Sequence, residues 1–338
     1  MKLYGGIDLH SNNSVVALLD EEDREVYRKR LANEATGVLE ALVPYREAIV
    51  GLVVESTYNW YWLVDALMEA GYRVHLANTA AIVQDSGLKY RDDDSDARWL
   101  AKLLRLGVLP EGYIYPKEER PVRDLLRRRS RLVQQHTANL LSVQNLFARN
   151  RGKSLSANEI KRLTPEAVSR LLPDVNHALA VQSTLLVMRA QEAAIDVLER
   201  TACARIKPRP AYRHLLSVSG VGTVLGLTIM LETGPLARFA QVGNYASYSR
   251  CVGSTRLSNG KRKGRGNTKS GNKYLAWAYL EAANFAVRYN PTIKRYYQRK
   301  RAKTNGVVAI KTVAHKLARA CYYILRDGTD FEVSRAFA

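Results

Sequence analysis

Ile49-Val50-Gly51-Leu52-Val53-Val54-Glu55 is the stretch that best predicts the fold of this chain. The run before Glu55 is apolar and mostly β-branched, which is typical of a strand buried on both faces in the middle of a sheet. Further strands are expected at 3–9, 14–19, 24–31 and 72–76, and helices at 35–43, 58–70 and 93–106. Because strands alternate with helices after an opening meander, the first part of the chain is expected to be an α/β domain, with a mixed sheet flanked by helices.

The middle of the chain has the pattern of long helices. After a linker rich in Pro and Gly at 107–121, a long basic helix is expected over 122–149 and a second helical region over 183–205. A polar break at 152–165 separates them, so the two helices form either an antiparallel hairpin or a dimerising coil. We therefore expect three parts, namely an α/β domain at 1–115, a helical coiled-coil segment at 116–206 and a mainly α C-terminal domain at 207–338.

The C-terminal part opens with a glycine-rich turn. Its segment 215–226 resembles a helix-hairpin-helix element, in which glycines let the backbone pass close to a phosphate and a helix N-terminus offers free N–H groups. The alternative is an ordinary glycine turn between two packed helices. Two more helices are expected, one at 273–289 that Asn290-Pro291 ends and one at 307–325.

Charge is strongly segregated along the sequence. The chain of 338 residues has a net charge of +20, yet its first hundred residues hold seventeen Asp or Glu against ten Lys or Arg. The stretch from Arg250 to Arg301 holds fourteen Lys or Arg and one acid, Glu281, and is threaded with Gly and Ser. Such a flexible cationic loop can follow a phosphate backbone, so a nucleic acid is the expected partner. The bland alternative is a soluble basic protein without a polyanionic partner.

Several classes of protein do not fit the sequence. There is no long uncharged apolar run, no lipidation signal and no signal peptide, so a membrane partner is not expected. The three cysteines Cys203, Cys251 and Cys321 are far apart and lack a CxxC spacing, which disfavours both a disulfide framework and a zinc site. The expected compartment is a reducing cytoplasm.

Four acids stand where they could meet. Asp8 ends one predicted strand and Glu55 ends another, and parallel strands direct their carboxyl ends to a shared crevice. Asp93 and Asp96 open a helix three residues apart and therefore share one face. Four converging carboxylates need cations, and hard oxygen ligands suit Mg²⁺ or Mn²⁺, which can clamp the oxygens of a phosphoryl transfer. The alternative for Asp93 and Asp96 is a first helical turn whose acids favour the helix dipole.

These motifs, in this order, resemble the insertion sequence 110 family of transposases. The N-terminal motifs are Gly5-Gly6-Ile7-Asp8-Leu9-His10, Val53-Val54-Glu55-Ser56-Thr57 and Asp93-Asp94-Ser95-Asp96-Ala97-Arg98. The C-terminal motifs are Ser217 to Gly222, Tyr248 to Gly253, Ser258-Asn259-Gly260-Lys261 and Gly266 to Leu275. The resemblance extends over nearly the whole chain, and it implies an RNase-H-like, RuvC-like fold for the N-terminal domain.

The resemblance also implies roles for particular residues. Asp8, Glu55, Asp93 and Asp96 would be the metal-binding acidic tetrad, although Asp92 or Asp94 could substitute for Asp93 within the run of three. A serine of the C-terminal domain would attack DNA and form a covalent link; Ser258 is the expected nucleophile and Ser254 the alternative. Phosphate contacts are expected from Lys261, Arg262, Lys263, Arg265, Lys269 and Lys273.

The function implied is that of a DNA recombinase of an insertion sequence, which cuts and rejoins strands in donor and target DNA. The family further implies a guide RNA (the bridge RNA), an active dimer or tetramer, and a bacterial or archaeal cell in which the protein is associated with the nucleoid. One rival is a metal-dependent RuvC-like nuclease or Holliday-junction resolvase that forms no covalent intermediate. Another is a non-catalytic nucleic-acid-binding protein.

Aromatic residues interleave with the cations near the end of the basic stretch. Tyr274, Trp277 and Tyr279 could stack on bases or pack the helix core, with packing favoured for Trp277. Further along the chain, Tyr289, Tyr296 and Tyr297 alternate with Lys294, Arg295, Arg299 and Lys300. This mixture suits a nucleic acid better than a plain solvated face.

Overall fold

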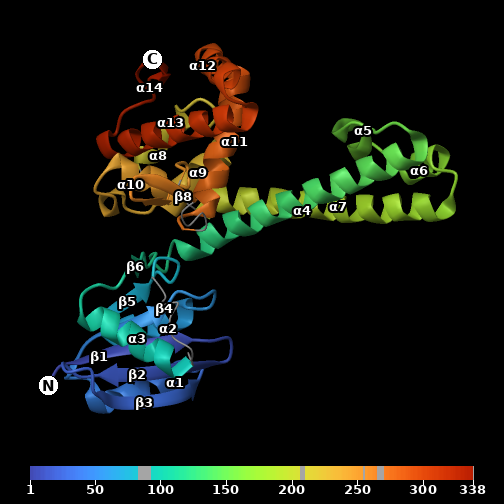
Figure 1. Ribbon diagram of the computed structural model, residues 1–338. Helices are drawn as coiled ribbons and strands as arrows, with labels where there is room; N and C mark the ends of the chain where they lie inside the picture. Colours follow the sequence, from blue (N-terminus) through green and yellow to red (C-terminus); the bar gives the residue numbers. More distant parts are fainter. Residues whose placement is uncertain (83–92, 206–209, 254–255, 265–269, 338) are drawn as a thin grey trace. The chain divides into compact units, whose positions relative to one another are not determined.

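The computed structural model describes residues 1–82, 93–205, 210–253, 256–264 and 270–337. The chain divides into two compact units, Met1–Lys117 and Glu118–Ala338 (Figure 1). The expected division of the second unit near residue 206 stays a prediction.

A six-stranded sheet forms the centre of the first unit. Its strands are β1 (Leu3–Leu9), β2 (Asn13–Leu19), β3 (Glu25–Ala32), β4 (Ile49–Glu55), β5 (Val74–Ala77) and β6 (Glu111–Gly112), in the order β3-β2-β1-β4-β5-β6. β1 pairs antiparallel with β2 and parallel with β4. The mixed sheet expected from the sequence is therefore confirmed, with the run of β4 near its middle. An RNase-H-like fold is compatible with this sheet and stays a prediction in its specifics.

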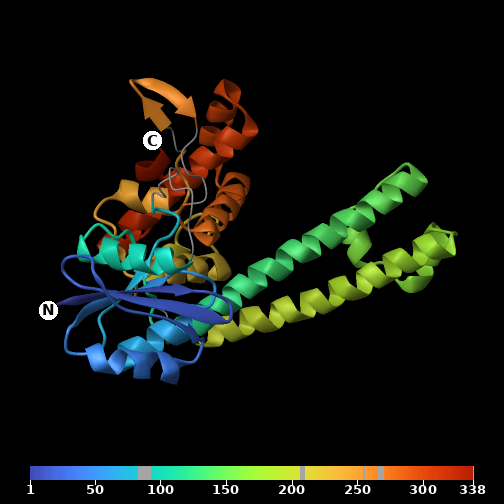
Figure 2. The ribbon, with the colours of Figure 1, turned by 60° about the horizontal axis from the view of Figure 1, so that its bottom comes forward.

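Helices cover both faces of the sheet (Figure 2). The helices of this unit are α1 (Ala35–Leu42), the 3₁₀ turn η1 (Val43–Tyr45), α2 (Tyr61–Glu69) and α3 (Asp93–Arg105). Residues of one parity in β1 and β4, such as Ile7 and Val54, pack with α1 and α2. Residues of the other parity, such as Gly6 and Val53, face α3. Alternation along each strand thus sends Asp8 and Glu55 to the α3 face.

Direct contact between β1 and α3 depends on Gly6. A Cβ at Gly6 would lie 1.9 Å from the carbonyl oxygen of Ala97 and 2.8 Å from the backbone nitrogen of Ala101. Backbone atoms cannot yield to a side chain in the way that a flexible side chain can, so the missing Cβ sets the distance between helix and strand.

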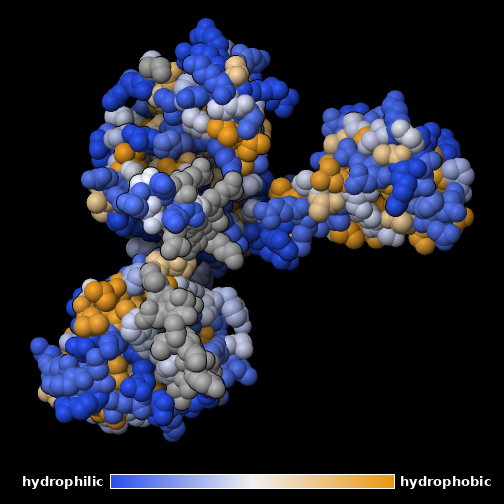
Figure 3. All heavy atoms as spheres, viewed as in Figure 1, coloured by the Kyte–Doolittle hydropathy of each residue, from blue (hydrophilic) through white to orange (hydrophobic). Residues whose placement is uncertain are grey.

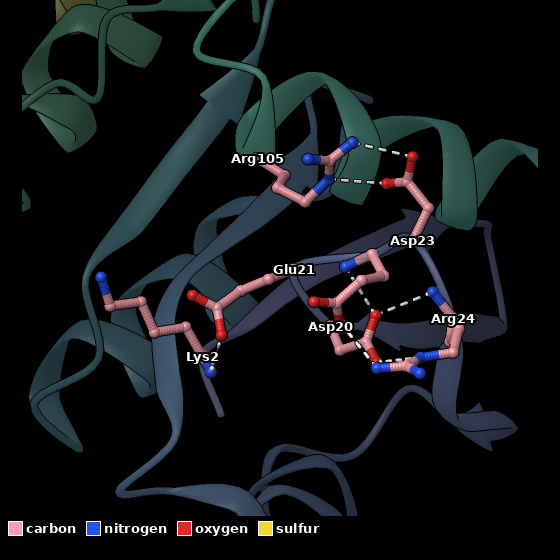
Figure 4. A network of polar contacts seen from close by, with 7 residues as sticks. Lys2, Asp20, Glu21, Asp23, Arg24 and Arg105 are labelled. Atoms are coloured by element: carbon pink, nitrogen blue, oxygen red, sulfur yellow. Dashed lines mark hydrogen bonds and ion pairs between the residues drawn. The ribbon is translucent and has the colours of Figure 1, made fainter.

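The direction of α3 is fixed at its other end. Leu104 lies beside Gly51 at the start of β4, whereas Leu100 packs with Val53 two residues further along the strand. Arg105 donates to both carboxylate oxygens of Asp23, at 2.6 and 2.8 Å, in the turn between β2 and β3 (Figure 4). That turn lies at the amino end of β1, because Leu19 pairs with Tyr4. The first turn of α3 therefore lies over the carboxyl ends of β1 and β4.

The second unit begins with two long helices, α4 (Arg120–Arg151) and α7 (Val175–Arg205), joined through α5 (Ala157–Lys161) and α6 (Pro165–Leu171). They lie side by side in Figures 1 and 2. Arg129 pairs with Glu199 at 2.7 Å, and Asn139 bonds Gln191 at 3.2 Å further out, so the helices run antiparallel. The hairpin alternative is confirmed, and a dimerising coil between two chains stays a prediction. The second helix starts at Val175 rather than 183, because the Asp174 carboxylate caps it at the His177 backbone nitrogen.

The rest of the second unit is mainly helical, with one small hairpin. Its elements are α8 (Pro210–Leu216), α9 (Thr223–Thr233), η2 (Leu236–Arg238), α10 (Val242–Tyr248), β7 (Arg256–Ser258), β8 (Lys261–Gly264), α11 (Lys273–Tyr289), α12 (Pro291–Lys303), α13 (Gly306–Asp327) and α14 (Val333–Phe337). The expected stop at Asn290-Pro291 is confirmed for α11. The sequence prediction missed that the same pair starts α12, where the Asn290 side chain accepts from the backbone nitrogens of Thr292 and Ile293.

None of the helices within the described ranges carries an apolar stretch of the length that a bilayer crossing needs.

Candidate functional site

The acidic candidates gather at one edge of the sheet in the first unit. Ile7 pairs with Val54 in the parallel β1–β4 ladder, and the next residue on each strand is a carboxylate, Asp8 and Glu55. Asp8 is 3% exposed and Glu55 is half-buried. Two carboxylates on neighbouring positions of one sheet face repel each other unless a cation or proton lies near them.

The first turn of α3 brings Asp96 and the backbone of Asp93 to the same edge. Asp96 is half-buried and lies one helical turn before Leu100. Leu100 packs on Val53, which lies two residues before Glu55 on β4. Asp93 is the first residue of the helix, but its side chain and that of Asp94 are not described, and Asp92 lies outside the described residues. Among side chains that are described, no three of His, Cys, Asp or Glu form a metal-holding group. The tetrad stays a prediction, which the strand register and helix direction support.

A polar network that the sequence did not reveal joins the loops after β1 and β4. The His10 imidazole lies 3.3 Å from the Asp8 carboxylate. The backbone oxygen of His10 accepts from Asn59 Nδ2 at 2.9 Å and from Asn33 Nδ2 at 3.0 Å. Asn59 in turn accepts from the hydroxyl of Thr57 at 2.7 Å. Asn59 thereby links the segment that follows Asp8 to the segment that follows Glu55.

The serine candidate lies in the second unit, at the tip of the hairpin β7–β8. Ser258 is the last residue of β7 and pairs with Lys261 across a two-residue turn. The turn residues Asn259 and Gly260 have φ of 49° and 70°, as a type I′ turn requires, and Asn-Gly is the sequence signal for such a hairpin. The basic loop expected from the sequence is thus a hairpin at this point, and its tip presents an exposed serine.

The structure describes only some of the expected phosphate contacts. The side chains of Lys261, Lys263 and Lys273 are exposed, and Lys273 Nζ lies 5.2 Å from the centroid of the Tyr274 ring. Arg262 is described by its backbone alone. Arg265, Lys269 and the alternative nucleophile Ser254 lie outside the described residues.

Close backbone contacts join the two ends of the segment that carries the hairpin. Arg250 Nε donates to the backbone oxygens of Ser270 and Gly271, at 3.1 and 3.0 Å. The backbone nitrogen of Asn272 donates to the carbonyl oxygen of Tyr248. Gly271 has φ of +89°, and a Cβ there would lie 2.5 Å from the Tyr248 oxygen. Residues 248–250 and 270–272, which we call the neck of the loop, are therefore fixed on the rest of the second unit.

A buried carboxylate, Glu232 of α9, fixes this neck to the long hairpin helix. Glu232 is 2% exposed and receives both Arg127 Nε and Nη2 from α4, at 2.6 and 2.8 Å. Its second oxygen also accepts from Asn272 Nδ2 at 2.7 Å. The Asn272 oxygen caps α11 by accepting from the backbone nitrogens of Tyr274 and Leu275. The sequence prediction missed Glu232, although an acid inside the apolar helix 223–233 is a signal for a buried polar partner.

Three of the aromatic candidates in this region, Trp277, Tyr279 and Tyr296, are packing residues. Tyr279 is fully buried and its hydroxyl bonds that of Tyr245, and burial raises the pKa of Tyr279 well above its ordinary value. Tyr296 is 8% exposed, and Trp277 packs against the same core, as expected for it. The packing alternative is therefore confirmed for Tyr279, and the Tyr296 ring is likewise covered.

The half-buried Cys251 and the buried Cys321 of the second unit are not available as nucleophiles. Burial raises the pKa of Cys251 to about 12 and that of Cys321 to about 12. A thiol attacks as its thiolate, so neither is reactive at neutral pH. Neither thiol is therefore an alternative nucleophile to the Ser258 hydroxyl.

The glycine turn between α8 and α9 has a packing role at one position. Gly220 has φ of +88°, and a Cβ there would lie 2.2 Å from the Ala282 carbonyl oxygen of α11. This contact favours the alternative of a glycine turn between packed helices. A helix-hairpin-helix phosphate contact stays a prediction.

Comparison with known proteins finds family matches in both halves of the chain. Residues 5–149 match the family model of the DEDD transposases of IS110, and residues 212–298 match that of the "Transposase IS116/IS110/IS902 family". The chain is 24% identical over 203 residues to an "Insertion element IS110 uncharacterized 43.6 kDa protein" of Streptomyces coelicolor, covering 54% of this chain and 49% of that protein. It is 25% identical over 274 residues to "Putative transposase y4qE" of Sinorhizobium fredii, covering 79% of this chain and 66% of that protein. The matches thus span about half the length of the first relative and 66% of the second. The two family models together cover more than half of the chain, which belongs to the IS110 family of transposases.

Proposed function

We propose that this chain is a DNA recombinase of an insertion sequence, which cuts and rejoins strands through a covalent link to Ser258. The observation that carries the proposal is the exposed serine at the Asn-Gly tip of a cationic hairpin whose neck is fixed on the protein body. A nucleophile in an exposed turn can reach a phosphodiester in a DNA groove, whereas a buried one cannot.

The proposed step exchanges one phosphoester for another. Ser258 Oγ attacks phosphorus, its proton passes to a base, and the bond from phosphorus to one deoxyribose oxygen breaks as that oxygen takes a proton. The DNA then remains attached to Ser258, and attack by a deoxyribose hydroxyl of another strand reverses the exchange and rejoins DNA. Lys261 and Lys263 flank the tip and would stabilise negative charge on the phosphoryl oxygens.

The acidic edge of the first unit would hold the divalent metal. Asp8, Glu55, Asp93 and Asp96 supply only carboxylate oxygens, and Asp8 and Glu55 follow paired positions of neighbouring strands, so the residues present fit Mg²⁺ or Mn²⁺. Bound there, the metal would polarise phosphoryl oxygens and favour deprotonation of a hydroxyl. Asn59 and Asn33 would hold the His10 segment, and with it Asp8, in place.

DNA and a guide RNA are the proposed partners, and a dimer or tetramer the proposed active form. The net charge of +20 and its concentration outside the first hundred residues support polyanionic partners. The guide RNA rests on the family alone. To test for this partner, the protein is expressed together with the DNA that flanks its gene, purified, and extracted for bound RNA. Formation of the adduct by RNA-free protein would refute the guide RNA.

The decisive experiment is a denaturing gel with labelled donor and target DNA, Mg²⁺ and the full chain. Wild type is expected to give a protein–DNA adduct, and Ser258→Ala to lose both adduct and joined product by on the order of 10³-fold or more. Asp8→Asn and Glu55→Gln are expected to abolish joining while DNA binding remains.

The same gel separates the rivals. If Ser258→Ala still cuts DNA and only the acidic variants fail, the chain is a nuclease or resolvase without a covalent intermediate. If wild type yields neither cut nor joined DNA and every variant binds DNA as wild type does, the chain binds nucleic acid without acting on it. Ser254→Ala is the matched control, and loss of the adduct in that variant alone would move the nucleophile to Ser254.

A further inference from the structure

We infer that Phe285 and Tyr289, together with the cations of α12, form a second nucleic-acid contact that stacks unpaired bases. The inference rests on the proposed function for a nucleic-acid partner, but it concerns residues other than those of the serine hairpin and the acidic edge.

The two rings form an open platform at the end of α11. Their centroids lie 6.4 Å apart and their planes differ by 7°, as expected for residues one helical turn apart. Phe285 is 44% exposed and Tyr289 is 69% exposed. Buried aromatic and alanine residues on the opposite face of α11 pack into the core, so the helix holds this pair rigidly toward solvent.

Large exposed rings need a reason beyond folding. Packing accounts for Tyr279 on the same helix, whereas it leaves most of the Tyr289 ring in water. An arginine, Arg288, lies with its guanidinium carbon 5.3 Å from the centroid of the Tyr289 ring. Parallel rings with a neighbouring guanidinium offer flat faces to a flat ligand, and base–aromatic stacking tolerates any base sequence.

The next helix supplies the charge that a phosphate backbone requires. α12 starts two residues after Tyr289 and carries no acid; its six cations are Lys294, Arg295, Arg299, Lys300, Arg301 and Lys303. All six are exposed, and the face of α12 that Figure 3 shows is mostly hydrophilic. Ile293 and Tyr296 are buried and anchor the helix, so the cations are presented from a fixed scaffold. The one acid nearby in sequence, Glu281, is half-buried one turn before Phe285.

Rings and cations together select the ligand. Phosphates satisfy the cations, and only unpaired bases expose faces to the rings, because bases in a duplex already stack on each other. Single-stranded DNA and single-stranded RNA share this chemistry. An acidic protein would satisfy the cations but would gain nothing from parallel rings, so we commit to a single-stranded nucleic acid.

The test measures binding of the full chain to a labelled 20-nucleotide DNA, the RNA of the same sequence and the duplex DNA, at one salt concentration, by fluorescence anisotropy. Stacking contributes about 1–3 kcal/mol per base, which is about 5- to 150-fold in Kd. Tyr289→Ala and Phe285→Ala are each expected to weaken single-strand binding by at least about 5-fold, while Tyr289→Phe keeps the affinity because it keeps the ring. Duplex binding is expected to change less than about 2-fold in all three.

Tyr323→Ala is the matched control. Tyr323 is 38% exposed and lies near an arginine, Arg326, at 4.8 Å, but its ring meets that of Tyr322 at 84°, so it offers no parallel pair of rings. It is expected to leave all three affinities unchanged. Lys294→Ala with Arg295→Ala should weaken binding of every nucleic acid and, when binding is repeated over a range of salt concentrations, reduce its salt dependence.

Equal losses for single strand and duplex, or no loss with Tyr289→Ala, would overturn the stacking site. A larger loss with RNA assigns the platform to a guide strand, and a larger loss with DNA assigns it to an unpaired donor or target strand; both support the inference. A protein site is indicated instead if Tyr289→Ala binds the single strand as tightly as wild type and an acidic peptide displaces the nucleic acid equally well from both proteins. The binding assay requires no cleavage, so its outcome is independent of the Ser258 adduct. A failed stacking test would not argue against the adduct, and a missing adduct would not argue against the stacking site.

Discussion

Glu232 is expected to be one of the most sensitive positions of the second unit. Its carboxylate is 2% exposed, and it receives two hydrogen bonds from Arg127 and one from Asn272. Removal of one partner of a buried ion pair costs about 3–5 kcal/mol. The Arg127 side chain is 27% exposed, so water compensates part of the loss and we expect about 3 kcal/mol for Glu232→Ala.

Hydrogen exchange followed by mass spectrometry measures this loss segment by segment. A loss of about 3 kcal/mol accelerates exchange of the protected amides in α9 and α11 by about 150-fold, whereas amides of the first unit should not change. Glu232→Gln keeps the volume and one acceptor and should cost roughly half as much. Glu199→Ala is the control: Glu199 also pairs with an arginine of α4, Arg129, but its side chain is 31% exposed, so the change should stay under about 1 kcal/mol.

The reasoning fails if Glu232→Ala accelerates exchange by less than about tenfold, or if Glu199→Ala has the same effect. It also makes a prediction for the pair. Replacing Arg127 by Met and Glu232 by Leu together should cost less than Glu232→Ala alone, because the double variant leaves no buried charge behind. An additive loss in the double variant would show that the ion pair is not the source of the effect.

Two further predictions concern the first unit. Gly6→Ala should destabilise this unit by about 3 kcal/mol in urea unfolding, because a Cβ there would lie 1.9 Å from the Ala97 oxygen. The control is Gly37→Ala, whose Cβ would meet nothing within 4 Å and which should be neutral or stabilising by up to about 1 kcal/mol. Equal effects of the two variants would contradict the packing of α3 on β1. The hydrogen bond from Arg105 lowers the pKa of Asp23, so this pair stabilises the folded state above the ordinary carboxyl pKa of 3.8 and loses that contribution as the pH falls through the lower folded value. Asp23→Asn should therefore flatten the acid side of the stability curve, and an unchanged slope below pH 3.8 would refute the assignment.

The order of strands and helices could be predicted because local patterns determine it. The β-branched run of β4 and the meander before it predict a mixed sheet, and β1, β4 and α3 lie within a few residues of their expected places. The start of α12 was missed because a proline reads equally well as the end of one helix and the first residue of the next. The hairpin β7–β8 was missed although Asn259-Gly260 signals it, because the surrounding glycines and cations suggested an irregular loop.

The candidate site was predictable in its residue types and not in its supports. A carboxylate after a buried strand is visible in a sequence, so Asp8 and Glu55 could be named. Asn59 could not, because its partner is a backbone oxygen 49 residues away and any loop amide has the same local pattern. Glu232 is similar, since its partners come from helices 105 and 40 residues away.

The supports explain how a small hydroxyl on a protruding hairpin can be positioned. A two-stranded hairpin alone is marginally stable, so the place of Ser258 depends on the neck beneath it. That neck is held by Arg250 on one side and by Asn272 on the other, and Asn272 is bonded to Glu232, which holds α4 through Arg127. A partner that shifts α4 would therefore act on the neck through one buried carboxylate. Loss of the Glu232 charge is therefore expected to loosen the neck as well as the packing of α4 on α9.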